Sequence, residues 1–237
     1  MENRVSFYEK ALDILSKSEL FKNLDKTVLA KIIEQSQECK WQKDEMIDPL
    51  EATKYLFIII SGRLKLSQIN IKSGRSATLF LLTSGDIYDV FSLLDGKEHL
   101  VEPVPLDNME LLKLPLENAR NFIKEYPKFN EAFLPYLGKR MRELEGFGES
   151  LIFHDTLTRL ANLILKHTDR CKDEESQHHP VKLINNLSHE AIAELIGSVR
   201  TVVSLQMKKL KDDKIVINHK GHLFVKDLEK LIEKCKL

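Results

Sequence analysis

The chain has 237 residues, and its 36 Lys and Arg balance its 36 Asp and Glu, while 43% of its residues are apolar. This composition is typical of an ordinary globular protein, so it excludes a disordered chain and a uniformly basic nucleic-acid-binding protein. The charge is unevenly distributed: residues 156–237 have 15 Lys and Arg against 11 Asp and Glu, whereas residues 1–155 have 21 against 25. The basic C-terminal part therefore leaves room for a polyanionic partner.

The three cysteines, Cys39, Cys171 and Cys235, are far apart and form no Cys-x-x-Cys or Cys-x-x-His spacing. A structural zinc site or an iron–sulfur cluster with four thiolates from one chain is therefore not expected. The N-terminus lacks the apolar core of a signal peptide, and the apolar run Leu56–Ile60 is too short to cross a bilayer. We expect a cytoplasmic protein with no membrane partner.

Residues 5–38 are predicted to be helical, with a polar break near Ser16–Ser18, because apolar residues recur there at steps of three and four. From about residue 40 to 115 the chain shows short β-type runs separated by glycine-bearing turns, and Pro103 and Pro105 mark edges or loops. This pattern indicates a compact antiparallel sandwich or barrel. The clearest predicted strands are Tyr55–Ile60, Leu64–Ile69 and Ala77–Leu82.

Helical periodicity returns at Leu116–Tyr126, stops at Pro127 and resumes in a long segment from about 129 to 153. Six residues of this segment follow the heptad pattern of a seam between two helices. They are Leu134, Leu137, Met141, Leu144, Gly148 and Leu151. The simplest partner is the same helix of a second copy in a symmetric dimer, and the alternative is a single helix packed on the barrel.

A further helix is predicted at Thr156–Thr168, followed by a polar, exposed loop from Asp169 to Pro180. His178 and His179 in this loop are expected to be solvated rather than to bind a metal, because no further ligand is positioned nearby.

The segment 187–226 has the pattern of a winged helix-turn-helix. Ser188 is predicted to cap a short amphipathic helix, and Gly197 permits a tight turn that requires a positive φ. A second helix is predicted from near Ser198 to about Lys211, and a β-hairpin wing follows at 215–225. The residues expected to face inward on the second helix are Val199, Val203, Met207 and Leu210.

The start of this second helix is expected to enter the major groove of DNA, which is wide enough for an α-helix. Arg200 is the forked donor there, and its natural contact is a bidentate one with guanine. Thr201, Ser204 and Leu205 share this face and could contact a thymine methyl or the DNA backbone. Phosphate contacts are expected from Ser188, His189, Lys208 and the wing residue Lys220. The predicted DNA-contacting residues are Ser188, His189, Ser198, Val199, Arg200, Thr201, Ser204, Leu205, Lys208 and Lys220.

The order of a β-roll, a long helix and a winged helix-turn-helix resembles the Crp/Fnr superfamily of bacterial transcription regulators. The stretches that resemble the family are Leu56–Leu66, Gly85-Asp86, Arg159–Ala161, Leu187–Leu210 and Val225–Leu228. The resemblance implies an α+β chain with N-terminal helices and a β-roll sensor domain at 1–128, a dimerisation helix at 129–155 and a winged helix-turn-helix domain at 156–237. It further implies a homodimeric regulator that binds double-stranded DNA, has RNA polymerase as a partner, and responds to an input at its sensor by a shift in population.

The chain departs from the family pattern in the second helix of the motif. Where the family often has Ser-Arg-Glu-Thr-Val-Ser-Arg, this chain has Val199–Leu205, so that Thr201 replaces the Glu and Leu205 replaces the second Arg. The operator is therefore expected to differ from the common half-sites of the family.

A second departure concerns the effector. Cyclic-nucleotide members use a Glu after the Gly-Asp turn, an Arg-Ser pair and a Thr-Ser pair on the dimer helix. The corresponding effector-pocket residues here are Val90, His99, Leu100, Leu144 and Glu145. Because the guanidinium clamp is missing and Glu145 would repel an anion, we do not expect cAMP to bind.

Haem-binding members of the family use His, Cys or Met ligands. His99 and His154 are the candidates here, with Met46, Met109 and Met141 as opposite ligands, and the alternative for each histidine is a surface or loop position. A pocket for an apolar or anionic metabolite, or no effector at all, also stays open.

No Gly-x-Ser-x-Gly, phosphate loop or His-Glu-x-x-His occurs in the sequence, so we do not expect an enzyme. The remaining alternative is a sensing and interaction module of the same fold whose helix-turn-helix has lost DNA binding.

Overall fold

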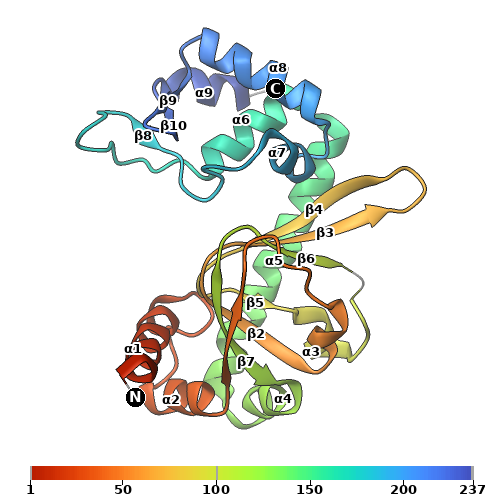
Figure 1. Cartoon of the computed structure of the whole chain (residues 1–237), viewed down its shortest axis with the longest axis vertical. Coiled ribbons are helices and arrows are strands. Elements are labelled where there is room, and N and C mark those ends of the chain that lie inside the picture. The colour runs from red at the N-terminus through yellow and green to blue at the C-terminus, as the bar shows by residue number, and fades with distance from the viewer. Residues whose placement is uncertain (1, 100, 236–237) are drawn as a thin grey trace. The chain divides into compact units, whose positions relative to one another are not determined.

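The computed structural model describes residues 2–99 and 101–235 (Figure 1). The chain divides into two compact units: the first contains the chain up to Arg75 together with Leu79–Arg142, and the second contains Ser76–Thr78 and the chain from Glu143 onward. Within the described ranges, no helix combines the length and the apolar composition that crossing a membrane requires.

Two sheets form a β-roll, with the strand orders β1-β7-β2-β5 and β4-β3-β6. The pairings of β2 with β7 and of β3 with β6 are antiparallel, which confirms the predicted α+β class. Strand β6 lies at the edge of its sheet, where its two prolines are tolerated because a proline nitrogen has no hydrogen to donate. The strands are β1 (Gln37–Trp41), β2 (Tyr55–Ser61), β3 (Leu64–Asn70), β4 (Arg75–Leu82), β5 (Ile87–Tyr88), β6 (Glu102–Pro105) and β7 (Met109–Pro115).

Strand β2 is buried on both faces, which explains its continuous apolar sequence. Phe57 and Ile59 belong to the core that contains the aromatic rings inside the roll, whereas Leu56, Ile58 and Ile60 belong to the core under the helices. Successive side chains of a strand point to opposite faces, so one five-residue run supplies both cores. Each such burial contributes roughly 1.5–3 kcal/mol to folding.

The N-terminal helical region is shorter and more divided than predicted. Residues 18–25 form turns between two helices, and β1 begins at Gln37, so the prediction of helix up to residue 38 was wrong. The long-range pairing of Gln37 with Lys113 of β7 overrides the local helical pattern. The helices up to residue 125 are α1 (Glu2–Lys17), α2 (Lys26–Glu34), the 3-10 helix η1 (Pro49–Thr53), α3 (Val90–Asp95) and α4 (Leu116–Glu125).

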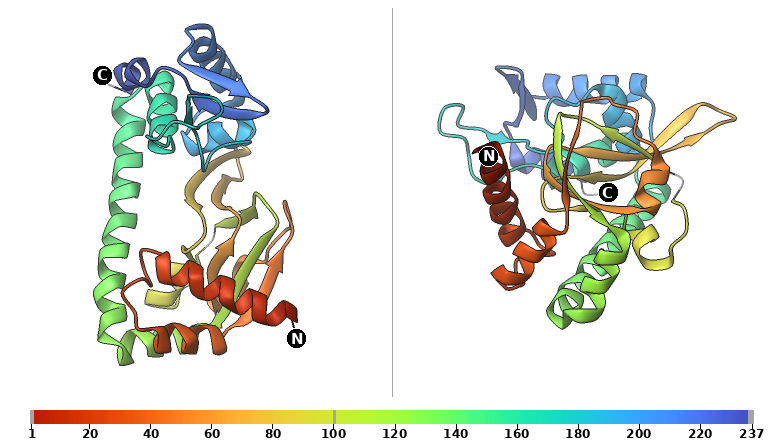
Figure 2. Two further views of the ribbon diagram at one scale, coloured as in Figure 1. Left: turned by 90° about the vertical axis from the view of Figure 1, so that its left-hand side faces the viewer. Right: turned by 60° about the horizontal axis from the view of Figure 1, so that its bottom comes forward.

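Helix α5 (Pro127–Phe153) is one continuous helix, visible as the long green element of Figure 2. It begins at Pro127 rather than near residue 129, because the first turn of a helix needs no hydrogen bond from the proline nitrogen. Pro135 lies inside the helix, where a proline usually costs about 3 kcal/mol. Burial of Phe129, Phe133 and Tyr136 in the core of the first unit offsets this cost.

The second unit contains the predicted winged helix-turn-helix. Its elements after α5 are α6 (Thr156–Lys166), β8 (His179–Pro180), α7 (His189–Leu195), α8 (Arg200–Asp212), β9 (Val216–His219), β10 (His222–Val225) and α9 (Leu228–Cys235). Helix α6 ends at Lys166, two residues before the predicted end. The sheet order is β8-β10-β9, so the predicted hairpin is confirmed and gains a third strand, β8, that was not predicted.

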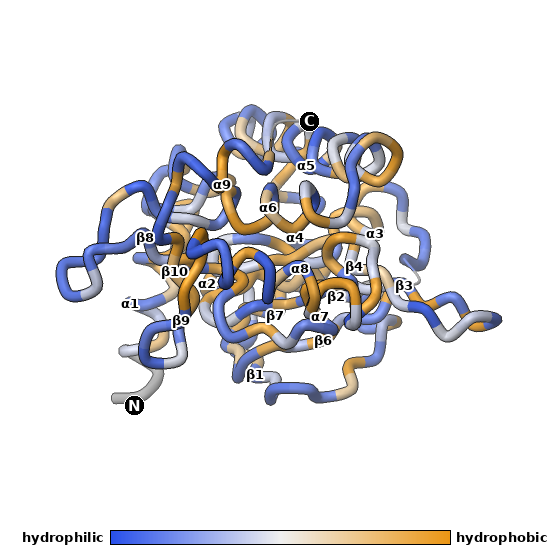
Figure 3. The backbone as a smooth tube through the Cα atoms, turned by 90° about the horizontal axis from the view of Figure 1, so that it is seen from above, coloured by the Kyte–Doolittle hydropathy of each residue, from blue (hydrophilic) through white to orange (hydrophobic). Residues whose placement is uncertain are grey.

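The loop that precedes β8 is hydrophilic, as its blue colour in Figure 3 shows. The prediction that both histidines of this region are solvated was wrong for His179. This residue pairs with Val225 of β10 and is buried, and its Nδ1 lies 3.1 Å from the carbonyl oxygen of Asp169. His179 is therefore buried because it pairs with β10, which is distant in the sequence. In the part of the chain that the structure describes, no group of three or more His, Cys, Asp or Glu side chains could hold a metal ion.

Candidate nucleic-acid interface

The first helix of the motif, α7, begins after an N-cap residue that the sequence also predicts. The Ser188 hydroxyl accepts a hydrogen bond from the backbone nitrogen of Ala191 at 3.1 Å and thereby caps α7. Helix α7 buries Ala191, Ile192 and Ala193.

The turn between α7 and α8 depends on Gly197 and on an arginine that sequence analysis did not identify as functional. Gly197 has a φ of 61°, in the left-handed region that favours glycine. Arg159 Nη1 donates to the carbonyl oxygens of Ile196 at 2.7 Å and Gly197 at 3.2 Å. The Arg159 guanidinium therefore positions the turn through these two carbonyl oxygens. The only sequence signal for Arg159 was its place in the family stretch Arg159–Ala161.

Helix α8 begins at Arg200, and Val199 occupies its N-cap position without making a side-chain cap hydrogen bond. The prediction that Val199 faces inward was wrong, since 45% of this residue is exposed. Val199 precedes the helix and has extended backbone angles, so the helical spacing on which the prediction relied does not apply to it. The other three predicted inward residues, Val203, Met207 and Leu210, are buried.

The face of α8 opposite these buried residues is open. Arg200, Thr201, Leu205 and Lys208 are exposed, whereas Ser198 and Ser204 are partly buried. His189 Nδ1 lies 2.8 Å from Ser204 Oγ, so α7 and α8 are joined by a direct side-chain contact at this surface.

The surroundings of His189 disfavour its protonated form. Partial burial, and then the positive charges of Lys211 and Arg200, lower the pKa of His189 below its ordinary value. The imidazole contacts Ser204 through Nδ1, whichever of the two groups donates the hydrogen bond.

The wing turn is built by two consecutive residues with positive φ, Lys220 at 49° and Gly221 at 84°, which is the pattern of a tight two-residue hairpin. The Lys220 ammonium group forms an ion pair with Glu175, and both side chains are largely exposed. A phosphate would therefore compete with Glu175 for this lysine.

In the sensor unit, two of the five predicted effector residues lie close to Asp89. Val90 follows it at the start of α3, and His99 Nδ1 lies 2.9 Å from Asp89 Oδ1. The Asp89 side chain is buried and also accepts hydrogen bonds from Phe91 N at 3.1 Å and Ser92 Oγ at 2.8 Å. His99 is thus engaged with an internal carboxylate.

The three other predicted effector residues are placed elsewhere or not described. Leu144 and Glu145 lie on α5 in the second unit, Leu144 partly buried and Glu145 exposed. Leu100 lies outside the described residues.

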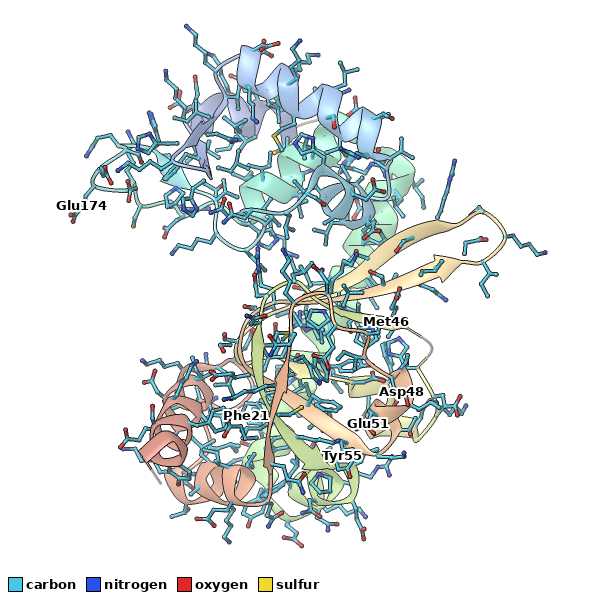
Figure 4. The ribbon with its side chains drawn as sticks, in the orientation of Figure 1. Phe21, Met46, Asp48, Glu51, Tyr55 and Glu174 are labelled. Carbon is cyan, nitrogen blue, oxygen red and sulfur yellow. The ribbon has the colours of Figure 1, made fainter. Side chains whose placement is uncertain are left out.

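The candidate haem ligands have separate surroundings. Met46 is 94% exposed at the surface near η1 (Figure 4), whereas Met109 is buried in the core inside the roll. Met141 is exposed on α5, and His154 Nδ1 lies 3.3 Å from Ser150 Oγ. His99 and His154 already contact Asp89 and Ser150, and Met109 is packed in the core, so a haem bound by any of these three would have to displace a contact that the structure shows.

A second arginine that sequence analysis did not identify as functional, Arg140, ties α5 to the Gly85-Asp86 turn of the roll. Its guanidinium forms an ion pair with Asp86, and Nη2 donates to the Tyr136 hydroxyl at 3.2 Å. Burial is the main cause that raises the pKa of Tyr136 to about 12. The sensor turn is therefore fixed to the helix by a charged contact.

The predicted dimer seam is exposed over part of its length. Leu134, Met141 and Leu151 are exposed, Leu144 and Gly148 are partly buried, and Leu137 packs against the core of the first unit. The next two residues of α5 after Leu151, Ile152 and Phe153, are also exposed.

Two family models match the chain. A cyclic nucleotide-binding domain model matches residues 42–126, and a Crp-like helix-turn-helix domain model matches residues 158–234. The chain belongs to the Crp/Fnr superfamily. This Crp/Fnr protein is a DNA-binding transcription regulator with a sensor domain of the cyclic-nucleotide-binding type.

Curated relatives of this Crp/Fnr regulator have different names. The global nitrogen regulator of a Nostoc species is 29% identical over 180 residues, which cover 75% of this chain and 79% of that protein. The CRP-like cAMP-activated global transcriptional regulator of Mycobacterium tuberculosis is 23% identical over 193 residues, 81% of this chain and 85% of that protein. The solved structure of a CooA mutant from Carboxydothermus hydrogenoformans has a TM-score of 0.71 at 22% identity and covers 87% of this chain and 90% of that one, which shows the fold.

Proposed function

We propose that two copies of this regulator bind a roughly palindromic promoter site, each placing the N-terminal end of α8 in the major groove. The observation that supports this most is the exposed side chain of Arg200 at the first residue of α8, which has no ion-pair partner among the described residues. Its guanidinium can contact a guanine without first breaking an internal salt bridge.

The experiment is selection from a random DNA library with the full-length protein. We expect a palindromic consensus with a guanine in each half-site and half-sites about 34 Å apart. An interaction module without DNA binding would enrich no sequence, and that result would overturn the proposal.

The role of Arg200 is tested on the selected operator. Arg200→Ala is expected to weaken operator binding by about 1–3 kcal/mol per protomer and to relax the guanine preference. Arg170→Ala is the matched control, because Arg170 is an equally charged, exposed residue of the same unit that lies outside the helix-turn-helix. Equal effects of the two substitutions would show that Arg200 contributes charge alone.

We further propose that α5 forms the dimer through the seam of residues 134–151, within the functional division 1–128, 129–155 and 156–237. Regulators of this family bind DNA and act as dimers, and the exposure of Met141, at 71%, leaves an apolar side chain available to a second copy. Met141→Glu is expected to shift sedimentation toward the monomer, whereas Arg142→Glu, an exposed neighbour outside the heptad pattern, is expected to leave it unchanged. A Met141→Glu protein that stays dimeric would favour the alternative of a single packed helix.

For the sensor domain we propose an effector other than cAMP. The support is the buried Asp89, which pairs with His99 where cyclic-nucleotide members offer an arginine to a phosphate. A second anion beside this carboxylate would be repelled. Titration calorimetry with cAMP is expected to show no tight binding, and tight binding would contradict the proposal and align the protein with its cAMP-activated relatives. Haem and a small metabolite are the alternatives to cAMP, and a Soret band after incubation with hemin would identify haem as the one that binds.

In this role the protein is located in the cytoplasm and contacts RNA polymerase at the promoter. Transcription in vitro from a template that contains the selected operator, with and without the protein, measures the sign of its effect. Identical transcript levels would remove the polymerase contact from the proposal.

A further inference from the structure

The outward face of α8 contains an apolar side chain that the fold does not use. Val203, Met207 and Leu210 are buried, so the helix turns Thr201, Leu205 and Lys208 to the opposite side. Leu205 lies in the middle of this side and is 64% exposed. A single exposed leucine is common on protein surfaces, so its exposure alone does not indicate a function.

The residue before the helix is the second observation. Val199 holds the N-cap position of α8 and is exposed, yet its side chain makes no cap hydrogen bond. Ser, Thr, Asp or Asn at an N-cap typically adds about 1 kcal/mol of helix stability. The helix therefore forgoes a stabilising residue at its exposed end and has an apolar one in its place.

Charge indicates what covers these apolar side chains. Within α8 the basic side chains Arg200, Lys208, Lys209 and Lys211 accompany Leu205, and the only acidic residue is Asp212 at the far end. A polyanion complements this helix, whereas a basic or neutral apolar surface would not. The partner must therefore combine negative charge with small apolar groups. The major groove of DNA has both, in its phosphates and in the 5-methyl groups of thymine.

We propose that Leu205, with Val199 at the start of the helix, contacts thymine 5-methyl groups in each half-site. This inference rests on the proposed DNA-binding function and specifies how it recognises sequence. Arg200 then recognises guanine by hydrogen bonds, and the neighbouring base pairs are recognised by methyl contacts instead of by a second guanidinium. Ser204 contributes little, because its hydroxyl already contacts His189.

The test replaces each thymine of the selected operator by uracil, which removes only the methyl group, and measures affinity by fluorescence anisotropy with the full-length protein. We expect at least one position in each half-site where uracil weakens binding by about fourfold, the usual effect of exposing one buried methyl group. Leu205→Ala is expected to abolish the thymine–uracil difference at that position. Lys208→Ala, the matched control on the same face, is expected to weaken binding to both duplexes and to leave their ratio unchanged.

The outcomes separate this inference from the proposed function. If the protein binds its operator but uracil has no effect at any position, or if every uracil effect persists in Leu205→Ala, the methyl contact of Leu205 is overturned and the DNA-binding function stands. If no operator is selected at all, both fall together. Leu205 is exposed, so circular dichroism of the Leu205→Ala protein is expected to match the parent.

Discussion

Gly197→Ala is expected to destabilise the second unit by about 2–3 kcal/mol. A non-glycine residue in the left-handed region costs about 1–2 kcal/mol, and Gly197 has a φ of 61°. A Cβ added there would lie 2.5 Å from Leu151 Cδ2 and 3.4 Å from Arg159 Nη1. Leu151 is exposed and its end can rotate, which adds of order 1 kcal/mol for a displaced rotamer.

Two other glycines separate the parts of this effect. Gly221 has a φ of 84° and no atom within 4 Å of an added Cβ, so Gly221→Ala measures backbone strain alone. Gly146 lies in α5 with equally open space and no positive φ, so Gly146→Ala is expected to be neutral or to stabilise by up to about 1 kcal/mol.

Urea unfolding followed by circular dichroism measures all three variants. The expected order of stability is Gly146→Ala, then Gly221→Ala, then Gly197→Ala. If Gly197→Ala is as stable as Gly146→Ala, the turn does not need a left-handed residue and the reasoning is refuted. If the stability of Gly197→Ala equals that of Gly221→Ala, the contact with Leu151 does not contribute to the loss, and backbone strain accounts for all of it.

Three further changes test the electrostatics of the fold by urea unfolding. Burial lowers the pKa of His167 to about 4, so the neutral form is favoured in the folded state. The free energy of unfolding of the wild type is thus expected to fall by up to about 3 kcal/mol, relative to His167→Gln, between pH 6.5 and pH 4, and parallel curves would contradict this. Asp155 caps α6 and its pKa is lowered mainly by the backbone hydrogen bond from Thr158. Asp155→Ala should cost about 1 kcal/mol at pH 7, and the difference should shrink as the pH falls below 3.8 and the carboxylate is protonated. His99→Ala removes a partner of the buried Asp89 carboxylate and should cost about 1–3 kcal/mol at pH 7; unchanged stability would show that the two remaining hydrogen bonds suffice.

The features of the winged helix-turn-helix that could be predicted from sequence are local. Ser188 caps α7 by accepting a hydrogen bond from the backbone nitrogen of Ala191, three residues later. Gly197 forms the turn because it adopts the positive φ that the turn requires. The hairpin of β9 and β10 likewise turns on the adjacent Lys220 and Gly221. Each signal involves residues close in sequence, so composition and spacing are enough to find it.

The features that were missed depend on residues far apart. Arg159 bonds to carbonyls 37 and 38 residues further on, and Arg140 pairs with Asp86 at a separation of 54 residues. Strand β8 exists only because it pairs with β10, and β1 exists only because it pairs with β7. No local periodicity marks such partners, because an arginine or a short strand looks the same in sequence whether or not its partner is in place.

The net charge of zero does not show which basic side chains are free to bind phosphates, whereas the ion pairs of the second unit do. In the second unit several lysines have an acidic partner: Lys166 with Glu143, Lys182 with Asp169, Lys220 with Glu175 and Lys230 with Asp227. On α8, by contrast, Arg200, Lys208 and Lys209 are exposed and have no ion pair among the described residues. Helix α8 therefore offers several exposed cations to phosphates without an ion pair to break. Because non-specific affinity grows with the number of phosphates neutralised, one such helix binds DNA weakly. In the dimer that we propose, two copies of α8 double the charge, and the proposed α5 seam is then as important for operator binding as Arg200.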